Sequence, residues 1–138
     1  MAVGLSLDRE TAIPRYEPKE VILTKEELTV LCWQWQETLR LQEWIIALSV
    51  CRARDMGDSR QGECAWIISK KEACISILDA IDFPPGHIHA QDMEKTLVHE
   101  LLHLHFAAFA SDEDYIDRAH EQAIDLIASG LIAQKRAA

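Results

Sequence analysis

The sequence predicts an α+β domain in which one layer of helices covers a small three-stranded sheet. Two observations carry this prediction. Apolar residues recur at the spacing of amphipathic helices in three stretches, and short apolar runs rich in β-branched residues lie between the first stretch and the second. The expected helices span about 24–42, 92–109 and 111–131, and the expected strands span 44–51, 64–69 and 73–78.

The first helix is expected to begin at Thr24, because Thr24-Lys-Glu-Glu27 is a capping box in which each end of the motif satisfies an unpaired backbone N–H. A stripe of apolar residues follows at helical spacing: Leu28, Leu31, Cys32, Trp35 and Leu39. The preceding residues 1–23 contain two prolines, mixed charge and no clean periodicity. They are predicted to be a tail or a loosely packed segment, and the domain itself is expected over 24–138.

The strands are expected to be short and partly covered. Between the second and the third, Lys70-Lys-Glu72 fits a hairpin turn. Along the third strand, apolar residues alternate with smaller ones, as in a strand with one covered face: Ala73, Cys74, Ile75, Ser76 and Ile77. Phe83-Pro-Pro-Gly86 then breaks regular structure before the second helix, for which Asp92 is a good N-cap.

Composition limits the classes of function. The chain is 49% apolar and 27% charged, as in soluble globular proteins, and no apolar run approaches the roughly 18 residues of a membrane span. The net charge of -9 opposes binding to a phosphate backbone, so neither nucleic acid nor a membrane is an expected partner. The four cysteines are scattered and the N-terminus lacks a secretory signal, so a reduced, cytoplasmic protein is expected.

The residues expected to carry chemistry lie in the second helix, in the sequence His99-Glu100-Leu-Leu-His103. The two histidines are four residues apart and project from one helix face, so both imidazoles can reach one zinc ion. Glu100 is rotated about 100° from His99 and is placed as a general base beside a metal-bound water. Burying these polar residues without partners would cost about 1–3 kcal/mol each. Zinc binding is therefore the favoured interpretation, and internally hydrogen-bonded core histidines are the alternative.

A catalytic zinc also needs a third protein ligand. The last helix is expected to bury one apolar stripe: Ile116, Ala119, Ala123, Ile127 and Leu131. Glu121 lies at the margin of this stripe, from which its carboxylate can enter a cleft, and it is the expected ligand. Asp125, one turn further on the same edge, is expected to accept a hydrogen bond from a ligand histidine. His120 is the rival ligand, although its place nearer the middle of the apolar face favours a core histidine.

The motif and the segment Glu121-Gln-Ala-Ile-Asp125 resemble the gluzincins, zinc peptidases whose His-Glu-x-x-His helix is followed by a helix that donates a glutamate. The chain looks most like the minigluzincins and similar small single-domain zincins, over about residues 24–131. The resemblance implies a minimal zincin domain in which helix 24–42 backs a small sheet. It also implies that strand 73–78 is an edge strand that pairs with extended substrate.

Other polar residues are weaker candidates. Tyr115 and Arg118 precede Glu121 and are candidates for stabilising an oxyanion. His87 and His89 form a loop His-x-His pair that could approach the mouth of a cleft, where such a pair can bind metal. His105, two residues past the motif, points to another part of the helix surface and is expected to be no ligand.

The predicted function is hydrolysis of peptide bonds with one zinc ion per chain and Glu100 as general base. A peptide or protein substrate would lie along strand 73–78 as an added strand. One alternative is a non-catalytic zinc-binding interaction module of the same fold. The other is a latent, zymogen-like form in which residues 1–23 or Gln134–Ala138 occupy the cleft. Substrate identity and oligomeric state cannot be predicted from the sequence.

Overall fold

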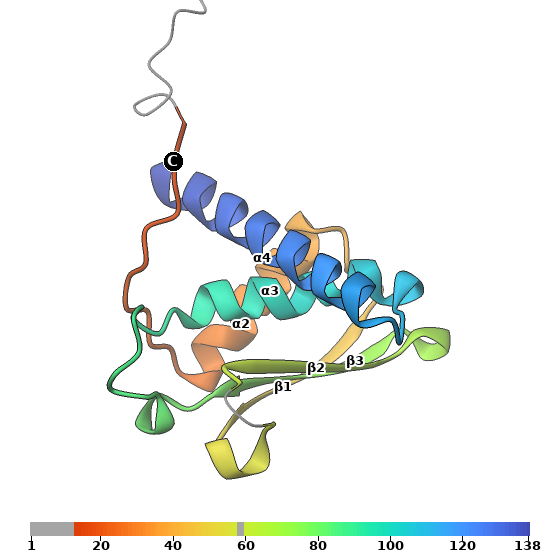
Figure 1. The fold of residues 1–138 in the computed structure, drawn as a ribbon, viewed down its shortest axis with the longest axis horizontal. Helices are drawn as coiled ribbons and strands as arrows, with labels where there is room; N and C mark the ends of the chain where they lie inside the picture. Colours follow the sequence, from red (N-terminus) through yellow and green to blue (C-terminus); the bar gives the residue numbers. More distant parts are fainter. Residues whose placement is uncertain (1–12, 58–59) are drawn as a thin grey trace, which may run out of the picture.

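A computed structural model describes residues 13–57 and 60–138 (Figure 1). Within them the chain forms three helices and a mixed three-stranded sheet, which confirms the expected α+β class. The helices are α2 (Lys25–Thr38), α3 (Met93–Phe106) and α4 (Asp114–Ala137), and the strands are β1 (Ile45–Cys51), β2 (Gly62–Ile67) and β3 (Glu72–Leu78). The helices lie on one face of the sheet, and no described helix has the length and apolar character needed to cross a membrane.

The order of the strands corrects one expectation. The sheet runs β1-β3-β2, with β3 parallel to β1 and antiparallel to β2. The strand expected at the edge, 73–78, is therefore the central strand, and hydrogen bonds to both neighbours leave it no free edge for a peptide. Its burial pattern explains this place, because Ile75 and Ile77 are fully buried under the helices. The edge strand that contacts α3 is β2.

Two residues with positive φ fix boundaries that the hydrophobic pattern misplaced. The capping box at Thr24 is present, but α2 ends at Thr38, because Leu39 is the C-cap and Arg40 follows at φ 62°. Between β2 and β3 the chain makes a short 3-10 turn over Ile68–Lys70 and then places Lys71 in the left-handed region at φ 51°. Lys71 thus supplies the conformation that glycine usually provides in tight turns.

The two C-terminal helices differ from expectation at their ends. Asp92 caps α3 by accepting a hydrogen bond from the backbone N–H of Lys95, and the helix tightens into a 3-10 turn after Phe106. The last helix continues six residues past the expected Leu131. Ile132 is fully buried there and the last turn is basic, which favours the negative end of the helix dipole.

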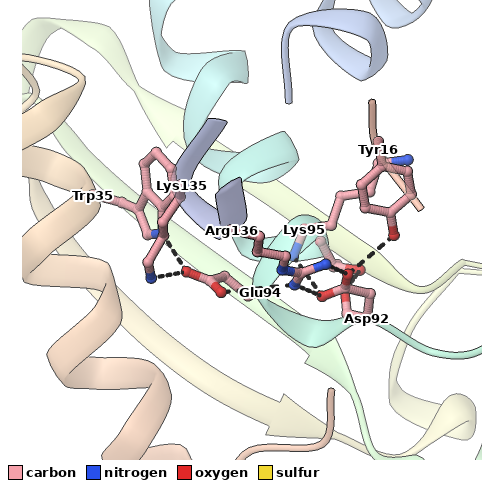
Figure 2. A network of polar contacts seen from close by, with 8 residues as sticks. Tyr16, Trp35, Asp92, Glu94, Lys95, Lys135 and Arg136 are labelled. Atoms are coloured by element: carbon pink, nitrogen blue, oxygen red, sulfur yellow. Dashed lines mark hydrogen bonds and ion pairs between the residues drawn. The ribbon is translucent and has the colours of Figure 1, made fainter. Parts of the chain in front are cut away.

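The N-terminal segment and the C-terminal turn meet at the start of α3 (Figure 2). Residues 13–23 are mostly irregular, and Val21 forms an isolated bridge with Asp92, so this part packs on the domain, while 1–12 of the predicted tail lie outside the described residues. Arg136 donates two hydrogen bonds to Asp92, at 2.7 and 3.0 Å. In this structure Gln134–Ala138 lie at the end of α4, and none of these residues lines the cleft.

Candidate metal centre

Two helices bring the predicted ligands together. His99 and His103 lie one turn apart on α3 and face Glu121 on α4. The Nε2 atom of His99 is 3.0 Å from Oε2 of Glu121, and Nε2 of His103 is 2.7 Å from Oε1. One ligand atom from each of the three residues lies within 4.8 Å of the others. This group could therefore hold a metal ion.

Packing on both helices explains why these side chains meet. On α3 the leucines beside the motif are buried, which leaves the two histidines on the face toward α4. On α4, Ile124, Ala128 and Ile132 are fully buried, and Glu121 sits beside this stripe with 47% of its side chain exposed. The helices run antiparallel, so the ligand turn of α3 meets the N-terminal half of α4.

Asp125 occupies the supporting position that was expected for it. Its Oδ1 atom lies 3.4 Å from Nδ1 of His99, the ring nitrogen turned away from Glu121. The ammonium of Lys95 lies 3.3 Å from the same oxygen. A carboxylate at this nitrogen fixes the ring orientation and leaves the opposite nitrogen to face a metal.

The donor set fits a divalent metal that accepts imidazole and carboxylate ligands. Burial lowers the pKa of His103 and outweighs the opposing effect of Glu121. The neutral imidazole is thereby favoured, and this is the form that coordinates a metal. The two carboxylate oxygens of Glu121 each lie near the Nε2 atom of one ring, so the three groups already converge around one point.

Glu100 lies beside this group and is almost completely buried, with 7% of its surface exposed. Burial raises its pKa to about 8, the charge of Glu121 adds to the rise, and Arg60 opposes it. Among the described residues, no side chain donates a hydrogen bond to its carboxylate. A buried, unpaired carboxyl group with this pKa is suited to proton transfer near neutral pH.

The absence of a side chain at Gly62 lets β2 approach Glu100. A Cβ atom built at Gly62 would lie 2.6 Å from Cγ2 of Thr96 and 2.9 Å from Oε2 of Glu100. Both distances are shorter than a normal van der Waals contact. Glycine at this place therefore allows the edge strand and the carboxylate of Glu100 to lie in contact.

A cleft of about 630 Å³ contains these groups. It lies between β2, α3 and α4, and β2 lines it with alternate residues: Gly62, Cys64 and Trp66. The Trp66 ring is stacked near His103, with centroids 6.2 Å apart and an angle of 20° between the planes. Burial raises the pKa of the Cys64 thiol to about 12, so this thiol is protonated at neutral pH in the metal-free protein.

The other sequence candidates are placed as follows. His120 packs its ring against Phe106, 5.5 Å between centroids, outside the ligand group. Tyr115 is exposed and Arg118 pairs with Asp114 on the surface, so neither lines the cleft. His105 lies on another face, with Nε2 2.6 Å from the backbone oxygen of Leu39.

His87 and His89 both line the cleft, at the end away from His103. Sequence reasoning missed further residues of its wall, among them Arg60, Trp66 and Tyr16. Only Trp66 had a readable signal, because it shares the two-residue period of a strand with Gly62. Arg60 and Tyr16 lie in irregular segments, where no periodicity indicates a direction.

Comparisons with known proteins add no assignment. No family model, no curated protein and no solved structure matches this chain.

Proposed function

We propose that this protein is a zinc-dependent hydrolase of peptide bonds, built on a zincin-type domain. The observation that carries the proposal is the convergence of His99, His103 and Glu121 in one cleft, with Glu100 buried and unpaired beside them. Two imidazoles and one glutamate are a known ligand set of catalytic zinc, which keeps a further position open for water or substrate.

Each residue has one part in this proposal. His99, His103 and Glu121 would hold the metal, and Asp125 orients the ring of His99. When bound, zinc lowers the pKa of a water molecule toward ~7 and polarises the carbonyl of the scissile bond. Glu100 takes a proton from the attacking water on a carboxylate oxygen and delivers it to the leaving amine nitrogen.

The edge of β2 is the proposed docking strand for substrate. This strand has one strand neighbour, β3, and within the described residues no backbone hydrogen bond occupies its other edge. An extended peptide can therefore add as a further strand, held by main-chain hydrogen bonds. Gly62 and Trp66 face the same cleft as Glu100 and His103, so this peptide would pass the reacting groups.

The test is a comparison of Glu100→Gln with the parent protein. Glutamine has nearly the same shape but cannot accept the proton, so the variant should keep its zinc and lose hydrolysis of a cleaved peptide by at least ~100-fold. Glu37→Gln, an exposed site on α2, is the matched control and should cleave as the parent does. Turnover retained in Glu100→Gln would assign the base elsewhere. A zinc-loaded parent that cleaves no peptide would favour the non-catalytic interaction module.

A further inference from the structure

Hydrogen-bond donors gather at one end of the cleft. Arg60 and Gln61 come from the segment before β2, and His87 and His89 come from the loop before α3. The amide nitrogen of Gln61 lies 3.3 Å from Nε2 of His87, so the two segments are in contact. The carboxylates of Glu121 and Asp125 line the same cleft from α4.

Arg60 differs from the other cation of the cleft. The ammonium of Lys95 pairs with Asp125 at 3.3 Å. The guanidinium of Arg60 has no carboxylate within 4.0 Å among the described residues. Among the residues that the structure describes, Glu63 is the acidic residue nearest to Arg60 in sequence, and it instead accepts a hydrogen bond from the backbone of Gly57. Arg60 thus brings a positive charge to the cleft, with no carboxylate partner among residues 13–57 and 60–138.

We propose that Arg60, with Gln61 and His87 beside it, binds a carboxylate of the substrate. The inference rests on the proposed function and deepens it. Preferred peptides carry either an acidic side chain or a free C-terminal carboxylate on the Arg60 side of the scissile bond. A guanidinium binds such a group through two parallel hydrogen bonds, which a neutral amide cannot match.

Three acidic groups of the cleft already face other partners. Asp92 is held by Arg136, Asp125 by Lys95, and Glu121 faces the two imidazoles. The charge of Arg60 reaches Glu100, where it opposes the rise in pKa that burial causes. Arg60 is therefore close to the reacting groups, and the bound carboxylate belongs to a residue near the scissile bond.

The experiment measures binding of labelled peptides to zinc-loaded Glu100→Gln protein by fluorescence anisotropy. Peptides come in pairs that differ by Glu against Gln at one position, or by a free against an amidated C-terminus, which separates the two sources of carboxylate. Arg60→Ala and Arg60→Lys are compared with Arg54→Ala, an exposed arginine of the same segment that lies outside the cleft.

The acidic member of one pair should bind ~10-fold more tightly, the scale of one charged hydrogen bond. Arg60→Ala should remove this preference, Arg60→Lys should keep part of it, and Arg54→Ala should keep all of it. Equal binding within every pair, or no binding at all, overturns the inference. The proposed hydrolysis is judged separately, by cleavage with the parent protein. If acidic peptides bind more tightly but the parent protein cleaves none of them, the proposed hydrolase activity is rejected and the carboxylate site is retained.

Discussion

The two ends of the α3–α4 interface use polar side chains in opposite ways. At the start of α3, Asp92 and Glu94 are 4% and 7% exposed, and each has basic partners. Arg136 holds Asp92 through two hydrogen bonds, and Lys135 and Trp35 donate to Glu94 (Figure 2). Buried carboxylates are paired here, and the two helices are joined.

Two turns further along α3 the balance reverses. His99, His103, Glu100, Glu121 and Asp125 gather around the cleft, and Lys95 is the one ammonium that pairs with them in the described residues. The same pair of helices therefore has one end whose charges are compensated and one end where carboxylates and imidazoles outnumber the one ammonium of α3. The difference suits the first end to stability and leaves a group at the second end that could hold a cation.

Removing Arg136 should have the largest effect on stability. Arg136→Ala leaves the buried Asp92 without its cation and should lower the free energy of unfolding by about 3–5 kcal/mol. Arg118→Ala is the matched control, because Arg118 pairs with Asp114 at the exposed surface, and it should change stability by less than about 0.5 kcal/mol. Urea unfolding of both variants measures the change in the free energy of unfolding. Equal losses would show that the start of α3 is not specially joined to α4.

A smaller effect is expected from pH, in metal-free protein. The pKa of Glu100 is raised from 4.5 to about 8, so between these values the folded state keeps a proton that the unfolded state has released. Stability should therefore fall as pH rises, by at most about 1.4 kcal/mol per unit, or about 2 kcal/mol from pH 6 to 7.5. Above pH 8 the fall should end.

Glu100→Gln isolates this effect. The pKa of His103 is lowered in the folded protein, so near pH 6.5 the unfolded chain binds more protons and stability rises with pH. This opposite contribution is common to the parent and to Glu100→Gln. Chemical unfolding with chelator, from pH 6 to 8, should show a declining difference between the parent and the variant. Parallel curves would mean that Glu100 is not buried as an uncharged acid.

The sequence predicted the helix faces of this site better than the sheet that borders it. His99, Glu100 and His103 were placed by helical periodicity alone, because spacing on one helix is fixed locally. The stripe expected on α4 was partly wrong, because Ala119 and Ile127 are exposed. The buried residues are instead Ile124, Ala128 and Ile132, and Glu121 lies beside them. Strand order depends on contacts between distant segments, so the central place of 73–78 was missed.

The cleft wall shows the same limit. Arg60 and Tyr16 reach the cleft from irregular segments, whose direction is set by tertiary packing and not by a repeat in the sequence. The role of the last turn of α4 was also not predicted. Its two basic residues are ordinary in sequence, and their role follows from the antiparallel crossing that brings them to Asp92 and Glu94.

The central claim, that the cation-deficient end binds zinc, is tested most directly by a competitive zinc titration of metal-free protein. The parent should bind about one zinc per chain. In Glu121→Ala the zinc affinity should fall by more than the ~10–100-fold expected for loss of a supporting residue. In Asp125→Ala it should fall within that range, and in His120→Ala it should fall least. A parent that binds no zinc would contradict the account, as would His120→Ala losing the metal while Glu121→Ala keeps it.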